Sequence, residues 1–308
     1  MSIQSTAAGE ADTPFDRARL DRLMEEAGID VLVATSKHNV QYLLGGYRYI
    51  FFHAMDAIGH SRYLPVLVYE RGRPDRAAYI GNKMEGMEQQ VNPFWTPTVK
   101  AIGRHGARIG IEPSFLPSDA WLALTAGLED ASFVDATGTL ERLRAVKTAA
   151  ELDLLRTASE LITDSMLAVF SGHGEGAGKA ELVDALRREE TERGLQFEYC
   201  LITIGSSHNR AVSSQSWQSG EVLSLDSGGN YRGYIGDLCR MGVLGEPDSE
   251  LQDLLAEVDA VQQAAFSRIR AGATGAEMIV HAEETLKSLP NAACNDFFAH
   301  GMGLISHE

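Results

Sequence analysis

Cysteine is scarce in this sequence of 308 residues, with three in all and no CxxC pair. Such a sparse, odd number indicates reduced thiols, and the polar, acidic N-terminus lacks the apolar core of a secretory signal. No apolar run reaches membrane-spanning length. We therefore expect a protein of the cytoplasm rather than a disulfide-stabilised secreted domain or an integral membrane protein.

Basic residues are also few. The 27 lysines and arginines are outnumbered by 43 aspartates and glutamates, which gives a formal net charge of −16. Such a surface repels nucleic-acid phosphates and anionic membranes, so neither is expected as a partner. Carboxylates are, however, ligands that divalent metals prefer, so the charge is compatible with a metal site.

The length is about twice that of a typical domain, so two domains are expected. Residues 14–28 carry apolar side chains at helical spacing, and short apolar runs at 29–36, 63–70, 76–81 and 107–112 are typical of strands. This alternation predicts an α/β domain in the first part of the chain.

The second part is predicted to be α+β. A long amphipathic helix begins near residue 145, and we place the boundary there, between a domain at 1–144 and a domain at 145–308. Thr274 and Glu277 form a plausible capping box. The expected elements are a helix over 179–194, strands within 197–243, and helices over 250–270 and 274–288.

A predicted hairpin over residues 222–243 is the strongest candidate site. Two strand-like runs flank a turn rich in glycine, and a turn centred near 230–232 would place Asp226 and Asp237 nearly opposite each other, with Cβ atoms about 5 Å apart. Carboxylates this close repel each other unless they share a proton or bind a cation. The alternative is one turn residue and one solvated strand residue, but the apolar row around Asp237 favours a bound metal.

Three histidines are further candidates. His300 and His307 lie in FFAHGMGLISHE, where glycines allow a ligand to approach the backbone closely. Either imidazole could be structural, but beside two aspartates His300 becomes a candidate nitrogen ligand for Mn, Zn, Co or Fe. His208, upstream of Asp226, is equally well explained as a surface histidine or a site residue.

These motifs resemble those of the creatinase / Xaa-Pro dipeptidase / methionine aminopeptidase family. Asp226-Ser-Gly…Gly233-Tyr234…Asp237…Arg240 resembles its D-x-G…G-Y…D…R metal hairpin, and His300-Gly-Met-Gly…His307-Glu308 resembles its H-G-x-G…H-E segment. His208-Asn209 has the position of its substrate-side histidine. SKHNVQYLLGGY resembles the N-terminal domain of creatinases and prolidases, and LRAVKTAAELDLLRTA resembles the start of their interdomain helix.

The resemblance implies a creatinase-like N-terminal α/β domain followed by a pita-bread catalytic domain. It implies that Asp226, Asp237 and His300 bind metal, and that His208 and His307 hold the scissile carbonyl or leaving group and stabilise the oxyanion. A hydroxide bound by two divalent ions (Mn, Co, Zn or Fe) would hydrolyse a dipeptide or another small amide, with Xaa-Pro dipeptides the leading substrates. It also implies a homodimer.

The sequence departs from the family at its end. The family completes its site with two glutamates on later strands, whereas this sequence stops at Glu308 inside the H-E motif. We therefore expect a C-terminally truncated fragment that is inactive by itself; a degenerate relative that binds without cleaving is the alternative. Family relatives also act on creatine, ectoine or dimethylsulfoniopropionate, and the aromatic-rich segment 47–63, with His53 and His60, allows such a non-peptide substrate.

Overall fold

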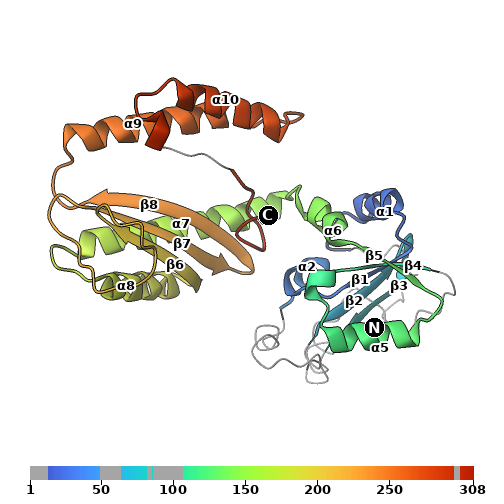
Figure 1. Ribbon diagram of the computed structural model, residues 1–308. Helices are drawn as coiled ribbons and strands as arrows, with labels where there is room; N and C mark the ends of the chain where they lie inside the picture. The colour runs from blue at the N-terminus through green and yellow to red at the C-terminus, as the bar shows by residue number, and fades with distance from the viewer. Residues whose placement is uncertain (1–12, 49–63, 82–84, 86–106, 295–298) are drawn as a thin grey trace, which may run out of the picture. The chain divides into compact units, whose positions relative to one another are not determined.

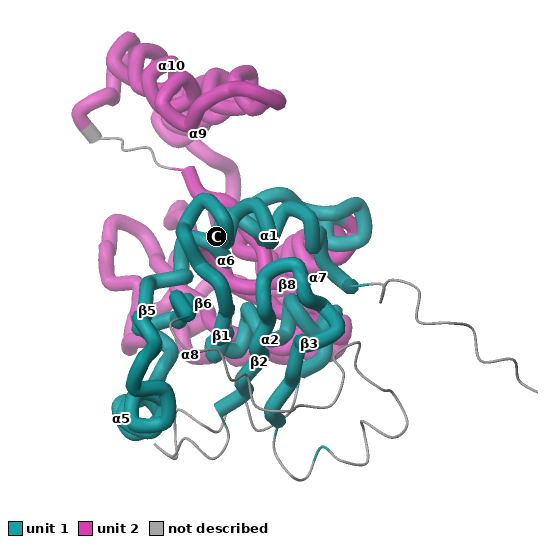
Figure 2. The backbone as a smooth tube through the Cα atoms, turned by 90° about the vertical axis from the view of Figure 1, so that its right-hand side faces the viewer, with its two compact units in different colours: residues 1–152, 308 teal, residues 153–307 magenta. Residues whose placement is uncertain are grey.

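The computed structural model describes residues 13–48, 64–81, 85, 107–294 and 299–308. Two compact units divide the chain, one of residues 1–152 together with Glu308 and one of residues 153–307 (Figure 2). His53 and His60 lie outside the described residues. The domain limits of 1–144 and 145–308 stay a prediction.

The first unit is built on a five-stranded mixed sheet in the order β3-β2-β1-β4-β5 (Figure 1). Strand β1 pairs in parallel with β4 and antiparallel with β2, and β5 extends the parallel side. All four residues of β1 are buried, which explains its continuous apolar sequence. The strands are β1 Val31–Ala34, β2 Val66–Glu70, β3 Arg73–Ile80, β4 Arg108–Ile111 and β5 Ser132–Asp135.

Helices cover both faces of this sheet, with α5 on one face and α1 and α6 on the other (Figure 1). Helix α1 begins where the Asp16 carboxylate accepts a hydrogen bond from the Arg19 N–H at 2.8 Å, and it ends before Gly28, whose φ of 66° suits a helix stop. The predicted helix over 14–28 is confirmed with tighter bounds. The helices are α1 Arg17–Glu26, α2 Lys37–Leu43, η4 Pro113–Phe115, α5 Ser118–Gly127 and α6 Thr137–Arg144.

The second unit is α+β, as predicted. Its three-stranded antiparallel sheet has the order β6-β7-β8, and the capping box of Thr274 and Glu277 begins the last long helix. The strands are β6 Gln196–Ile204, β7 Val222–Tyr231 and β8 Tyr234–Val243. The helices are α7 Ala149–Gly172 (which crosses the division at Leu152), α8 Lys179–Glu192, α9 Ser249–Phe266, α10 Gly275–Lys287 and the short η5 Ala292–Cys294.

Helices α7 and α8 cover one face of this sheet (Figure 1). Leu223 and Leu225 of β7 are buried against Ile162 and Leu186 of these helices, so the residue between them faces the other way. This alternation places Asp226 on the sheet face that α7 and α8 do not cover. None of the helices in the described ranges is both long enough and apolar enough to cross a membrane.

Candidate metal centre

The β7–β8 hairpin presents both aspartates on one face. Its two-residue turn is Arg232-Gly233, with φ angles of 53° and 99°, so Asp226 pairs with Cys239 and Asp237 pairs with Gly228. The expected turn centre near 230–232 was therefore too early. The aspartates are diagonal neighbours on the same face, two positions apart, rather than nearly opposite.

Asp237, His300 and His307 come together on this face, each with one ligand atom within 4.8 Å of the others. Asp237 Oδ2 lies 3.7 Å from His307 Nε2 and 3.9 Å from His300 Nε2, and the two rings stack with centroids 4.0 Å apart. The Ile235 N–H donates to the Gly303 carbonyl at 2.8 Å, which attaches the segment carrying both histidines to β8.

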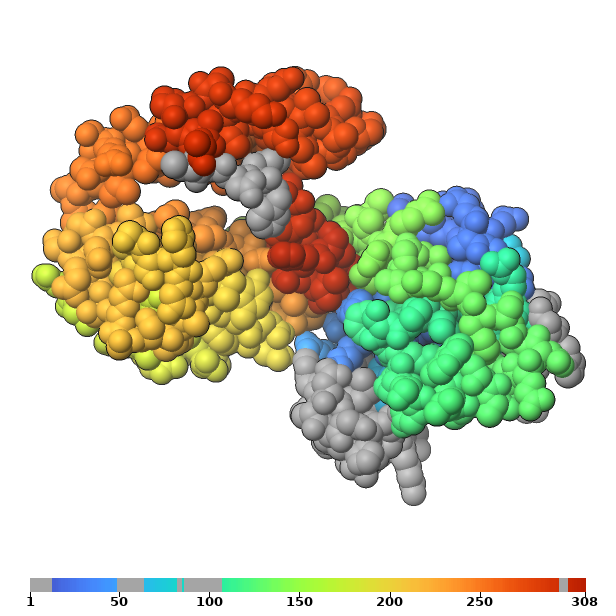
Figure 3. All heavy atoms as spheres, viewed as in Figure 1, coloured from blue at the N-terminus to red at the C-terminus, as the bar shows by residue number. Residues whose placement is uncertain are grey.

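This group remains reachable from solvent. The side chains of His300 and His307 are 31% and 66% exposed, whereas that of Asp237 is 9% exposed. The terminal segment that carries the histidines lies at the surface, dark red in Figure 3. The site thus combines the nearly buried carboxylate of Asp237 with the solvent-accessible imidazoles of His300 and His307.

Asp226 is not part of this group of three. Its carboxylate pairs with the Arg210 guanidinium, which belongs to the loop between β6 and β7. Burial raises the pKa of Asp226; the Arg210 charge opposes this rise and the Asp237 charge adds to it. The two carboxylates therefore repel each other, as expected for a pair that binds a cation.

His208 is also apart from the group. It is exposed in the same loop, two residues before Arg210, whose carbonyl accepts a hydrogen bond from the Ile202 N–H at 2.9 Å. Of the five residues predicted for the site, the structure thus brings Asp237, His300 and His307 together, leaves Asp226 beside them on the sheet, and leaves His208 in the flanking loop.

Tyr199 is a site residue that we did not predict. It pairs with Gly228, which in turn pairs with Asp237, and a Cβ on Gly228 would lie well inside 3.0 Å of the Tyr199 ring. The ring therefore crosses the bare glycine and its hydroxyl donates to the Asp237 carboxylate; burial and this hydrogen bond raise the pKa of Tyr199. The sequence signal for this contact is a tyrosine, a glycine and an aspartate that pair in one row across three strands. This row can be recognised only when the pairing register of β6 with β7 is known.

Behind the site, Glu190 of α8 is fully buried. The Ser227 hydroxyl lies 2.7 Å from Glu190 Oε1 and 2.7 Å from the Tyr199 carbonyl oxygen. Ser227 has one proton and can donate it to only one of these oxygens at a time, so protonation of Glu190 would let the acid donate to Ser227 while Ser227 donates to Tyr199. Burial raises the pKa of Glu190 to about 7, and the hydrogen bond from Ser227 opposes this rise.

Replacing Glu190 with glutamine should flatten the pH dependence of stability. The pKa of Glu190 rises from 4.5 to about 7 on folding, so its stabilising contribution is complete below pH 4.5 and is lost as the pH rises through 7. This loss amounts to about 3 kcal/mol in the wild type. Glutamine does not ionise and still donates to Ser227, so unfolding free energies measured by denaturant between pH 4.5 and 8 should lack that decline.

Glu189→Gln is the matched control, because Glu189 lies next to Glu190 but is part-exposed and paired with Arg193. That variant should keep the wild-type slope. Parallel curves for the wild type and Glu190→Gln would show that Glu190 is already ionised in the folded protein.

The donors at this site fit a divalent cation. One carboxylate oxygen and two imidazole nitrogens lie within 4.8 Å of one another, and the oxygen is 3.7 and 3.9 Å from the two nitrogens, too far for a direct hydrogen bond to either. Mixed nitrogen and oxygen ligation suits Mn, Zn, Co or Fe. A Tyr199 hydroxyl that orients a ligating carboxylate is typical of metal sites.

Comparison with known proteins supports the same interpretation. A model of metallopeptidase family M24 matches residues 153–308, and a model of the creatinase/prolidase N-terminal domain matches residues 17–146. An uncharacterized peptidase, YqhT of Bacillus subtilis, is 24% identical over 94% of this chain and 82% of its own length. An Xaa-Pro dipeptidase of Pyrococcus furiosus is 23% identical over the same shares.

Solved structures are similar along nearly the whole chain. An Xaa-Pro dipeptidase from Bacillus anthracis has a TM-score of 0.77 at 22% identity, covering 95% of this chain and 82% of that one. The prolidase from Pyrococcus furiosus has a TM-score of 0.75 at 20% identity, covering 94% and 84%. The predicted fold, a creatinase-like α/β domain followed by a pita-bread catalytic domain, is confirmed.

Proposed function

Because the chain belongs to metallopeptidase family M24, with a creatinase/prolidase N-terminal domain ahead of the catalytic domain, we propose that it is an Xaa-Pro dipeptidase. Membership makes it a hydrolase of a family that uses divalent metal ions. The observation that carries the proposal is the group of Asp237, His300 and His307 beside Asp226 on an open sheet face. Relatives described as Xaa-Pro dipeptidases support the substrate class.

In this proposal Asp226, Asp237 and His300 bind two divalent ions, Mn, Co, Zn or Fe. When bound by these residues, such ions would supply polarisation of a scissile carbonyl and a nucleophile derived from water at neutral pH. Tyr199 keeps the Asp237 carboxylate oriented through its hydroxyl. The buried position of Asp237 excludes water from one side of the carboxylate and strengthens its interaction with a cation.

His307 and His208 act on the substrate in this proposal. The exposed imidazole of His307, 3.7 Å from Asp237 Oδ2, is placed to donate a hydrogen bond to a carbonyl oxygen or leaving amine bound at the site. His208 approaches from the β6–β7 loop, whose Arg210 already contacts Asp226. We further propose that the protein is cytoplasmic, as its sparse cysteines and polar N-terminus indicate, and that it is a homodimer, as the family resemblance implies.

Metal analysis and a substrate panel test this function. The protein should hold about two divalent ions per chain and hydrolyse Xaa-Pro dipeptides. The panel compares Ala-Pro and Leu-Pro with Ala-Ala, creatine, ectoine and dimethylsulfoniopropionate. Turnover of only a non-peptide compound would reject the dipeptidase proposal. Absence of both metal and turnover would indicate a binding module.

A further inference from the structure

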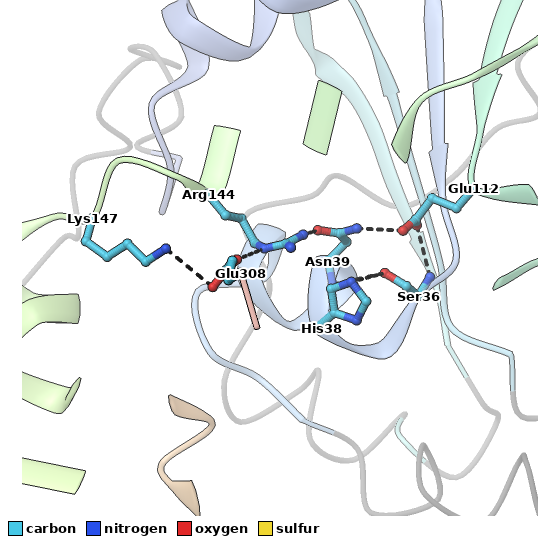
Figure 4. A network of polar contacts seen from close by, with 7 residues as sticks. All are labelled: Ser36, His38, Asn39, Glu112, Arg144, Lys147 and Glu308. Carbon is cyan, nitrogen blue, oxygen red and sulfur yellow. Dashed lines mark hydrogen bonds and ion pairs between the residues drawn. The ribbon is translucent and has the colours of Figure 1, made fainter. Parts of the chain in front are cut away.

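A buried polar network in the first unit ends on Glu308 (Figure 4). The side chains of Arg144 and Glu308 are only 2% and 3% exposed, and Arg144 Nε donates to Glu308 Oε1. Lys147 Nζ lies 3.4 Å from the other carboxylate oxygen of Glu308. Two cations, one at the last residue of α6 and one three residues after it, thus bind one carboxylate, and the charges of Arg144 and Glu308 are almost fully removed from water.

The Arg144 guanidinium is itself held in place. Its Nη1 donates to Asn39 Oδ1, and Asn39 Nδ2 donates to Glu112 Oε1 at 2.5 Å. The other oxygen of Glu112 accepts from the Thr35 and Ser36 N–H groups at 2.7 and 3.0 Å. Figure 4 shows this chain of contacts running from Glu112 through Asn39 to Arg144 and Glu308.

The network is built for rigidity more than for stability. A buried ion pair recovers its desolvation cost only where hydrogen bonds satisfy the remaining polar atoms, and here Arg144 Nη2 is buried with no hydrogen-bond partner among the described residues. Two side chains in succession, Glu112 and Asn39, fix the direction of one nitrogen of the Arg144 guanidinium. Such support suits a residue that must hold its partner in one position.

We propose that Arg144 and Lys147 are positioning residues for the proposed hydrolysis, because they hold Glu308 and thereby fix the backbone at His307. Consecutive Cα atoms are about 3.8 Å apart, so anchoring the Glu308 side chain restricts the preceding peptide. That peptide carries the imidazole that lies 3.7 Å from Asp237. The inference rests on the proposed function only for its kinetic consequences.

Arg144→Lys, Glu308→Gln and the double variant test this inference kinetically. Each single change should lower kcat for an Xaa-Pro dipeptide about 10- to 100-fold, with KM and metal content near the wild-type values. Because Arg144 acts through Glu308, the double variant should lose little more than Glu308→Gln alone. Arg142→Lys is the control, since Arg142 lies in the same helix with its exposed guanidinium 2.9 Å from Glu26.

The imidazole signals of 15N-histidine-labelled protein provide a readout that needs no turnover. The signals of His300 and His307, whose rings lie 4.0 Å apart, should shift in Arg144→Lys and not in Arg142→Lys. Unchanged histidine signals together with a wild-type kcat in Arg144→Lys would overturn the inference. It would also be overturned if the loss of kcat in the double variant equalled the product of the losses in the two single variants. Should Arg144→Lys fail to fold, Lys147→Met gives the same test, with Lys147→Arg expected to restore wild-type behaviour.

The two proposals fail separately. If the wild type does not hydrolyse dipeptides but the histidine signals still move in Arg144→Lys, the positioning role stands and the dipeptidase proposal fails. If hydrolysis is present and the variants leave both kcat and the signals unchanged, only the positioning role fails.

Discussion

Asp237→Asn is expected to abolish metal binding and to lower dipeptide hydrolysis at least about 1,000-fold. Asp237 is the shared partner of the group, since its carboxylate faces both imidazoles and accepts the Tyr199 hydroxyl. Asparagine keeps the shape but removes the negative charge, so of the three proposed ligands only Asp226 and His300 would remain to bind a divalent cation. Elemental analysis of the purified variant and its initial rates with an Xaa-Pro dipeptide measure both effects.

The control for this change is Asp253→Asn, which removes one carboxylate from the exposed surface of α9. It should leave metal content and kcat at wild-type values. Thermal unfolding should show that Asp237→Asn is folded. A folded Asp237→Asn protein that keeps its metal would mean that the cation binds elsewhere, and the role assigned to the hairpin would have to be abandoned.

Gly228→Ala is expected to destabilise the second unit by about 1 to 3 kcal/mol and to impair the site at the same time. A Cβ at this position would lie well inside 3.0 Å of the Tyr199 ring, so the ring must leave the row that leads to Asp237. The Tyr199 hydroxyl would then no longer orient the carboxylate, and metal affinity should fall about 10- to 100-fold. Denaturant titration and metal titration measure the two losses.

A second change separates the steric loss from the functional one. Removal of the ring in Gly228→Ala/Tyr199→Ala should relieve the clash and recover part of the stability, whereas metal affinity should stay low. Gly172→Ala at the end of α7 is the control, because a Cβ there meets no atom within 4 Å. If Gly228→Ala binds metal as the wild type does, Tyr199 has no part in orienting Asp237.

Local signals explain why much of the fold was predictable. Apolar spacing located α1 and α9, and the pairing of Thr274 with Glu277 fixed the start of α10, because a capping box depends only on neighbouring residues. The residues between Val222 and Val243 predicted a hairpin for the same reason. Helix ends were less certain, and α9 ends at Phe266 although apolar residues continue beyond it.

The site was less predictable, because its geometry depends on contacts between distant residues. The run SGGNYRG offers several two-residue turns, and composition favoured an early one, but the chain turns at Arg232-Gly233 with Arg232 in the left-handed region. The full pairing of β7 with β8, from Val222–Val243 to Tyr231–Tyr234, outweighs the cost at Arg232. Tyr199 and Arg144 could not be identified because their partners lie on other elements.

The alternation of side chains along β7 limits how this hairpin can change in evolution. Asp226 and Ser227 are consecutive, yet one belongs to the candidate metal centre and the other to the buried layer beneath the sheet. Insertion or deletion of a single residue within either strand would exchange these two surfaces and turn carboxylates toward α7. Length changes in pairs, or within the turn itself, preserve the arrangement. Homologous hairpins should therefore keep the parity of their strands even where the sequence has diverged.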